Sequence, residues 1–286
     1  MKKGKDYLTA AVILLLITAS LAGVLSMDFS HAHNFVNQYG QKVSLYGYGI
    51  YANDTYFKAP ISIGTDLCIL FMFVPMFIYT YVKYLKKSDA VNELKMISVY
   101  GVSLYYSASI AFGLTYNRLF LVYTALFACS LFGMFIHIRN LKLNCAVKLT
   151  RGIKILLIVL GIALFVAWFP DIIPSLINGG TLSQIGVYTT EITYIIDMGI
   201  IAPICFISIY LLSKKDSLGT IMMAVIMKLG MVIGVMMITQ SACQVVSIAD
   251  MPIGAVITKA GSFVVLSIFA YYFNNRMYKE ISENIR

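Results

Sequence analysis

Long apolar runs separated by short polar connections dominate the chain. Eight of these runs are about 20 residues long and contain few charged side chains. A bilayer core of ~30 Å requires about that length of helix, because unpaired backbone polar groups are too costly in hydrocarbon. The pattern therefore predicts an all-α integral membrane protein, a single domain over residues 1–286, with eight transmembrane helices over residues 7–25, 66–85, 95–115, 118–138, 153–170, 190–212, 218–239 and 254–273.

Basic residues collect in the two tails and in every second connection, which hold 17 of the 22 Lys and Arg residues. Cytoplasmic loops carry an excess of Lys and Arg, so this bias orients the chain. An odd number of spans would break the alternation. We therefore predict that both termini are cytoplasmic. The 17 residues are Lys2, Lys3, Lys5, Lys83, Lys86, Lys87, Lys95, Arg139, Lys142, Lys148, Arg151, Lys154, Lys214, Lys215, Arg276, Lys279 and Arg286.

The first apolar run allows two interpretations. A basic start followed by an apolar run and the small residues near Ser20 and Ala22 also describes a secretory signal. The run is long for a signal peptide, which favours an uncleaved span. Whether the segment is cleaved stays open at the level of sequence.

Two connections on the non-cytoplasmic side have distinct compositions. Residues 27–65 are rich in Tyr, Gly and Asn, a turn-rich pattern that predicts an ordered cap or a short hairpin. Residues 170–189 contain Pro174, Gly179 and Gly180 and no basic residue, and they predict a short interfacial helix followed by a turn.

A repeated spacing suggests an internal duplication. Pro75 is followed by the pair Lys86 and Lys87, and Pro203 is followed at the same offsets by Lys214 and Lys215. A parallel repeat of four spans plus four spans would give this match, and transporters are often built from such halves. The alternative is that basic residues end both helices because topology requires them there, and that the proline match is chance.

Composition agrees with a chain that has lipid as its main solvent. Hydrophobic residues make up 59% of the chain, charged residues 12%, and the mean hydropathy is +0.82. The net charge of +9 forms no basic patch with interleaved aromatic residues, so a nucleic-acid partner is not expected. The five cysteines include no C-x-x-C pair and are expected to pack as small apolar side chains.

Ionisable residues inside the spans are the main candidates for function, because each one is costly in hydrocarbon. Asp197 is placed ~9 Å below the outer boundary and Lys228 ~15 Å deep, so the two are predicted to form an ion pair. Asp66, Arg118 and Glu191 lie at the outer mouths of spans and predict an outward-facing polar cavity. The alternative is that the mouth residues meet lipid headgroups and that the pair is structural. His137 is predicted to face headgroups at the cytoplasmic end.

The sequence contains no nucleotide-binding loop, serine-hydrolase elbow or H-E-x-x-H motif. Asp28, His31 and His33 are closely spaced, but a metal site would need a further ligand and a rigid loop. Neither a metal nor a cofactor is therefore expected.

The segments GTDLCILFMFVP (64–75), TYNRLFLVYTALFA (115–128) and TEITYIIDMGIIAP (190–203) resemble parts of a loosely defined group of uncharacterised multi-pass prokaryotic membrane proteins. The resemblance covers about half of the chain and implies no activity. It implies the plasma membrane of a prokaryote as the location, and it groups Asp66, Arg118 and Asp197 in one site.

Three functional classes follow from these features. The first is a transporter of a small solute or ion, with a pathway that includes Asp197, Lys228, Glu191, Arg118 and Asp66. The second is a membrane-embedded enzyme that acts on a lipid or lipid-linked substrate, with Arg118 or Lys259 binding phosphate. The third is a non-catalytic sensor or assembly partner that uses its Tyr-rich cap. Partners expected for all three are the bilayer and an unidentified solute, ion or lipid.

Overall fold

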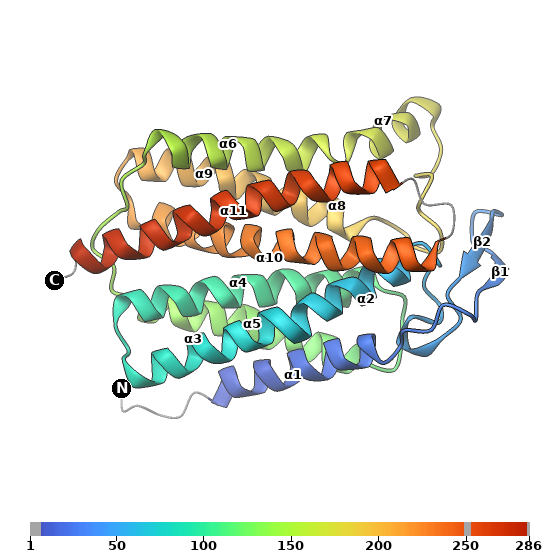
Figure 1. The fold of residues 1–286 in the computed structure, drawn as a ribbon, viewed down its shortest axis with the longest axis horizontal. Helices are drawn as coiled ribbons and strands as arrows, with labels where there is room; N and C mark the ends of the chain where they lie inside the picture. The colour runs from blue at the N-terminus through green and yellow to red at the C-terminus, as the bar shows by residue number, and fades with distance from the viewer. Residues whose placement is uncertain (1–6, 249–252, 285–286) are drawn as a thin grey trace.

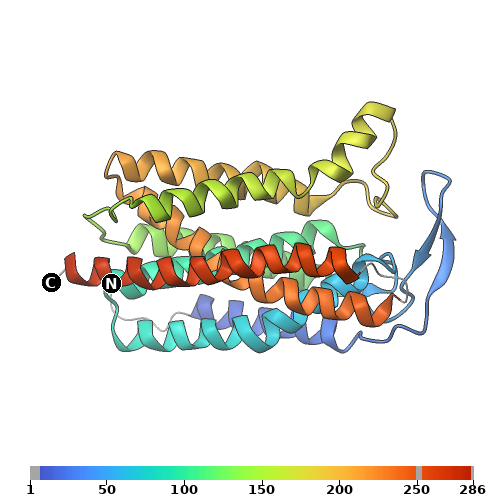
Figure 2. The ribbon, with the colours of Figure 1, turned by 45° about the horizontal axis from the view of Figure 1, so that its top comes forward.

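The structure, a computed structural model, describes residues 7–248 and 253–284, with the side chains of 253 and 255–259 left out of the description. Its helices lie side by side in one bundle (Figure 1). The start of α1 and the end of α11 lie at one end of the bundle, here called the terminal end, and strands β1 and β2 lie at the opposite end, here called the hairpin end (Figures 1 and 2).

The helices pass back and forth along the bundle. In chain order they are α1 (Tyr7–Val24), α2 (Lys58–Cys68) continued by η2 (Ile69–Phe73) and α3 (Val74–Lys86), α4 (Ala90–Gly113), α5 (Phe120–Asn140), α6 (Arg151–Val166), α7 (Phe169–Asn178), α8 (Ile192–Ile196) continued by η3 (Asp197–Ile201) and α9 (Ala202–Ser213), α10 (Ser217–Ser247) and α11 (Ile253–Asn284). The all-α prediction is confirmed.

Within the described residues, seven helices are long and apolar enough to cross a membrane. They are Tyr7–Val24, Lys58–Lys86, Ala90–Gly113, Phe120–Asn140, Arg151–Asn178, Ile192–Ser213 and Ser217–Ser247. The chain is thus suited to be a multi-pass membrane protein. The predicted eighth span, 254–273, falls within α11, where part of the side chains lie outside the description.

Two predicted boundaries change the depth of polar residues. The second span begins at Lys58 and not at residue 66, since Pro60 is compatible with the first turn of a helix. Asp66 therefore lies eight residues inside the helix, ~12 Å from its start. Similarly, α10 continues to Ser247, so Gln240 belongs to the helix and donates a hydrogen bond of 2.8 Å to Thr65 Oγ1 of α2.

The connections at the hairpin end fold as predicted. Residues 33–36 (β1) and 42–45 (β2) form an antiparallel hairpin with His33 opposite Leu45, and Gly49–Tyr51 forms a 3₁₀ turn (η1). The prediction of an ordered cap with a hairpin is confirmed. The other connection forms the short helix α7, which ends at Gly179 in the left-handed conformation (φ 65°). The predicted helix and turn are confirmed.

The hairpin and the segment after α7 are joined to each other. Asn37 Nδ2 donates to the Gly186 carbonyl at 2.6 Å, and Gln38 Nε2 donates to the Tyr188 carbonyl at 3.2 Å. Gly186 also packs so closely on Thr55 that an added Cβ would lie 2.3 Å from Thr55 Cγ2. The two connections therefore form one cap over the bundle.

Two helices are interrupted in the same way. The π-helical segment η2 is followed by Val74 and Pro75, and η3 is followed by Ala202 and Pro203. A proline removes one backbone donor and its ring clashes with a carbonyl in the preceding turn, and a wider π turn accommodates both effects. The helix that follows each interrupted helix has an aspartate as its N-cap, Asp89 for α4 and Asp216 for α10.

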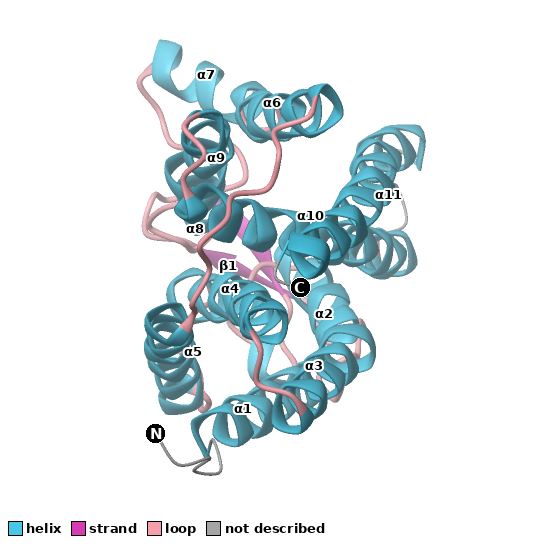
Figure 3. Ribbon diagram, turned by 90° about the vertical axis from the view of Figure 1, so that its left-hand side faces the viewer, coloured by secondary structure: helices cyan, strands magenta, loops and turns pink. Residues whose placement is uncertain are grey.

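The packing partners of the helices are also similar in the two parts of the chain. In the first part, α4 packs on α3 and α5, and α1 packs on the helix formed by α2, η2 and α3. In the second part, α10 packs on α9 and α11, and α6 packs on η3 and α9. Seen along the bundle axis, α4 and α10 lie between α1, α3 and α5 on one side and α6 and α9 on the other (Figure 3), and α4 and α10 are in contact with each other.

Candidate functional site

Asp66 is a buried carboxylate of α2. Its side chain accepts hydrogen bonds from the hydroxyls of Tyr51, at Oδ2, and Tyr106, at Oδ1 with a distance of 2.6 Å. Only 1% of Asp66 is exposed. Gly23 of α1 leaves room for this carboxylate, since a Cβ there would lie 1.6 Å from Asp66 Oδ2. Among the described residues, no ion pair involves Asp66.

Asp197 is the first residue of η3 and is also buried. Its Oδ1 accepts a hydrogen bond from the Tyr105 hydroxyl at 3.2 Å, and its Oδ2 accepts one from Trp168 Nε1 at 3.1 Å. The Trp168 ring is stacked on Tyr194, with centroids 4.3 Å apart. Asp197 is therefore held from α4 and from the end of α6.

The two carboxylates are linked through α4. Tyr105 and Tyr106 are consecutive residues, and they donate to carboxylates on two helices that are both interrupted by a π segment. Because helix side chains one residue apart point in different directions, α4 can contact both interrupted helices at one level. A shift of α4 would change both hydrogen bonds together.

A third polar cluster lies directly under the cap. Lys58 Nζ lies 2.5 Å from Glu191 Oε1 and 3.8 Å from the centroid of the Tyr188 ring. The Tyr188 hydroxyl donates to Asp54 Oδ1 at 2.8 Å, and the same oxygen accepts from the Thr115 backbone N–H at 3.0 Å. This cluster, Asp54, Lys58, Tyr188, Glu191 and Thr115, joins both connections of the cap to the ends of the helices.

Burial has the largest effect on the pKa of the two residues of this cluster that lie in the connections, Asp54 and Tyr188. It raises the pKa of Asp54 to about 6, although the hydrogen bonds from Thr115 and Tyr188 and the charge of Lys58 each act to lower it. Burial also raises the pKa of Tyr188 well above its ordinary value, and the Asp54 charge adds to that effect. Asp54 is therefore a carboxyl that can change its charge near neutral pH.

The predicted ion pair between Asp197 and Lys228 is not among the ion pairs of the described residues. Asp197 lies ~24 Å along the helix axis from Ser213, whereas Lys228 lies ~17 Å from Ser217 at the same end. The two side chains are thus at different depths. Lys228 is buried, and its charged neighbour is Lys95 of α4.

The other predicted site residues are also separated. Glu191 pairs with Lys58, and Arg118 is exposed just before α5. Asp66 and Asp197 are linked through α4, but among the described residues no hydrogen bond or ion pair joins either of them to Glu191, Arg118 or Lys228. Lys259, proposed above as a phosphate ligand, is a side chain outside the description.

At the terminal end, His137 and Glu93 form a buried pair, with Nδ1 and Oε1 2.6 Å apart. The rings of Tyr84 and Tyr100 lie 5.3 and 5.1 Å from the His137 ring, measured between centroids. The prediction that His137 faces headgroups is therefore wrong. The rotation of α5 about its axis directs the His137 ring towards Glu93 of α4. A hydropathy pattern does not specify this rotation.

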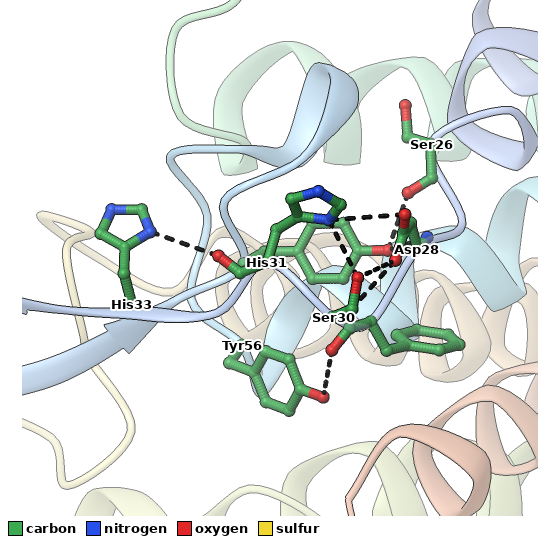
Figure 4. A network of polar contacts seen from close by, with 8 residues as sticks. Ser26, Asp28, Ser30, His31, His33 and Tyr56 are labelled. Atoms are coloured by element: carbon green, nitrogen blue, oxygen red, sulfur yellow. Dashed lines mark hydrogen bonds and ion pairs between the residues drawn. The ribbon is translucent and has the colours of Figure 1, made fainter.

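The two histidines of the cap contact different partners. Asp28 accepts hydrogen bonds from Ser30, and its Oδ2 lies 3.4 Å from His31 Nδ1. His33 is directed at the His31 carbonyl (Figure 4). Hydrogen bonds from Ser30 lower the pKa of Asp28. Within the described residues, no group of three His, Cys, Asp or Glu side chains is arranged to hold a metal.

Comparisons with known proteins give no relative. No protein-family model matches the chain, and neither curated proteins nor solved structures give a match. The interpretation of the site therefore depends on its own geometry.

The residues that hold the carboxylates were not found from the sequence. In the sequence these residues cannot be distinguished from ordinary interfacial or core aromatics, since aromatic side chains are common in both places. They are Tyr51, Tyr105, Tyr106 and Trp168. The available signal was the Tyr105–Tyr106 pair, two polar-tipped aromatics within an apolar run.

Proposed function

We propose that the protein is a membrane transporter for a small solute or ion, built from two related halves that move against each other. The observation that carries the proposal is the pair of hydrogen bonds from Tyr105 and Tyr106 to Asp197 and Asp66. Carboxylates inside membrane helices are costly, and they are retained mainly along transport pathways. Here one helix contacts a carboxylate in each half.

A four-plus-four parallel repeat is supported by features beyond the proline spacing. Both interrupted helices have a π segment directly before the Val-Pro or Ala-Pro dipeptide, at residues 69–73 and 197–201. The helices that follow, α4 and α10, are both capped by aspartate and pack on each other. The two halves therefore share four features: the proline, the π turn before it, the lysine pair after it and the aspartate that caps the next helix. A coincidence of all four is less probable than a coincidence of the proline spacing alone.

The π segments are the parts of the bundle suited to bending. A π turn and a proline each interrupt the regular i to i+4 ladder, so a helix can change direction there at lower cost than elsewhere. Asp197 begins η3, and Asp66 lies within the turn before η2. Bending at these points would move the carboxylates relative to Tyr105 and Tyr106.

In the proposed transport cycle, this structure represents the conformation that is closed towards the outside. The cap is joined to the helices by the ion pair between Lys58 and Glu191 and by the Tyr188–Asp54 hydrogen bond. In the proposed cycle these contacts separate when a solute enters. A groove of about 330 Å³ lies between the hairpin and the segment after α7 and is lined partly by Thr55, Gln184 and Gly186.

The proposed topology has eight spans with both termini cytoplasmic, in the plasma membrane of a prokaryote. It is supported by the concentration of 17 of the 22 basic residues on one side. It is also supported by the common location of the start of α1 and the end of α11 (Figure 1). The enzyme alternative needs a carboxylate that a lipid headgroup can reach, whereas Asp54, Asp66 and Glu191 are buried.

Reconstitution into liposomes tests the proposal. Fluxes of protons, Na⁺ and a panel of labelled amino acids, sugars and organic anions are measured for the wild type and for Asp66→Asn and Asp197→Asn. We expect flux of at least one probe, reduced tenfold or more by either variant. The control is Asp28→Asn, which changes an exposed carboxylate of the cap. Equal flux in folded wild type, Asp66→Asn and Asp197→Asn would contradict the proposal.

A further inference from the structure

Among the described residues, Glu191 Oε1 has no hydrogen bond but pairs with Lys58, and three other buried oxygen atoms near the cap have neither a hydrogen bond nor an ion pair. They are Asp54 Oδ2, Thr115 Oγ1 and Tyr123 Oη. Asp54 is 0% exposed and Tyr123 is 3% exposed, so bulk water does not compensate them. Buried polar groups are normally paired, and several orphans in one region indicate a missing partner.

The three oxygens belong to one region. Thr115 lies in the connection between α4 and α5, and its backbone N–H donates to Asp54 Oδ1 at 3.0 Å. Tyr123 lies in the first turn of α5, and the carboxylates of both Asp54 and Asp66 act electrostatically on its hydroxyl. The Tyr123 hydroxyl is thus within electrostatic range of the two carboxylates, and the Asn117 side chain also lies beside it.

The charges in this region do not balance. Lys58 is the cation that acts on Asp54, but its Nζ lies 2.5 Å from Glu191 Oε1. One lysine therefore faces two carboxylates, and Asp66 has no ion pair among the described residues. The C-terminal end of α4, at Gly113, adds partial negative charge next to Thr115. One more positive charge would neutralise the group formed by Asp54, Glu191 and Lys58.

We propose that Asp54, Thr115 and Tyr123 bind one Na⁺ ion through these three oxygens. One carboxylate and two hydroxyls form a hard, oxygen-only donor set, which suits a group 1 or group 2 cation and not a soft metal. The set has a single carboxylate, which favours a monovalent over a divalent ion. Irregular backbone next to a helix end, as at Thr115, is where transporters bind Na⁺.

A proton is the main competitor for this site. Because burial raises the pKa of Asp54 to about 6, the carboxyl is protonated at pH 5 and ionised at pH 8. The charged and titratable groups that face it are Lys58, Glu191, Tyr188 and Tyr123. A proton compensates only Asp54 Oδ2, whereas Na⁺ engages all three oxygens. Na⁺ binding should therefore weaken as the pH falls.

Thermal unfolding of the purified full-length protein in detergent tests the site. Unfolding is followed by circular dichroism in NaCl, KCl or choline chloride at equal ionic strength, at pH 8 and pH 5. At pH 8 we expect NaCl to raise the unfolding midpoint by about 3 °C over choline chloride, because a ligand that binds only the folded state stabilises it. At pH 5 the difference should disappear.

Three variants locate the effect. Asp54→Asn keeps an oxygen that can accept from Thr115 and Tyr188 but removes the charge, and it should abolish the Na⁺ shift. Thr115→Val and Tyr123→Phe each remove one hydroxyl and should weaken Na⁺ affinity tenfold or more, which keeps the test decisive if Asp54→Asn does not fold. The control Asp28→Asn should keep the full shift.

Two outcomes would overturn the site. Equal midpoints in NaCl and choline chloride at pH 8 would mean that water or a proton fills the space. A Na⁺ shift that is unchanged in Thr115→Val and Tyr123→Phe would place the ion elsewhere. The site deepens the proposed transport function, but its readout is stability, so a failure of transport and a failure of Na⁺ binding are distinguished.

Discussion

Tyr105 and Tyr106 are adjacent in α4, yet their hydroxyls donate to carboxylates in different halves of the bundle, Asp197 and Asp66. This relationship places α4 between the two interrupted helices. It also makes the two hydroxyls separable by mutation, since Tyr→Phe removes a donor and leaves the ring.

Tyr106→Phe is expected to destabilise the protein by about 1–3 kcal/mol, because Asp66 Oδ1 loses its donor in a fully buried position. Thermal unfolding in detergent measures the change. Tyr79→Phe, which removes a hydroxyl from a side chain that is 63% exposed, is the control and should leave the midpoint unchanged. Equal midpoints for Tyr106→Phe and the wild type would show that the bond contributes no stability.

Gly23→Ala is expected to destabilise by about 1–3 kcal/mol or more, because the new methyl group would lie 1.6 Å from Asp66 Oδ2 and the carboxylate would have to move. The matched control is Gly199→Ala, where nothing lies within 4 Å of an added Cβ. Unfolding midpoints of the two variants are compared directly. Similar midpoints for both would contradict the close packing of Asp66 on α1.

Glu191→Gln is expected to destabilise by about 1–3 kcal/mol, because Lys58 is left partly buried without its carboxylate. The double variant Lys58→Met with Glu191→Gln should recover part of the loss, since no unpaired charge remains. A double-mutant cycle of unfolding free energies measures the coupling. Additive losses would mean that the pair does not hold the cap.

The pH dependence of stability should report Asp54. Its pKa is about 6 in the folded protein, above the ordinary value of 3.8 for an aspartate. Below about pH 4 both states hold the proton, whereas between about pH 4 and 6 only the folded state does. Stability should therefore fall by about 2–3 kcal/mol as the pH rises through this window, then level off. Unfolding midpoints in Na⁺-free buffer should show this fall in the wild type and not in Asp54→Asn; parallel profiles would contradict it.

Lys228→Met is expected to stabilise the protein by about 1 kcal/mol, because a buried ammonium group is replaced by an apolar side chain of similar length. The control is Lys83→Met, at an exposed position in the last turn of α3. Unfolding midpoints are again the measurement. A loss of stability at Lys228 would indicate that its charge is compensated in the folded state.

The features that follow from local pattern were predicted correctly. Apolar length predicted the seven long apolar helices of the described residues, although the second begins eight residues earlier and the seventh ends eight residues later than expected. The turn-rich composition of residues 27–65 predicted the hairpin at 33–45. Pro170 and Gly179 bounded α7. Each depends on residues within one turn or one span of each other. The buried pair of His137 and Glu93 was missed because it depends on how α5 is rotated about its axis.

The sequence by itself determined the all-α class, the apolar helices and the composition of the cap, because hydropathy and turn chemistry act over short distances. Only the tertiary structure decided the partners of the buried charges. Asp197 meets Tyr105 and Trp168 in place of Lys228, and Glu191 meets Lys58. Depth and rotation of packed helices select these contacts, and both are set by residues far apart in the chain.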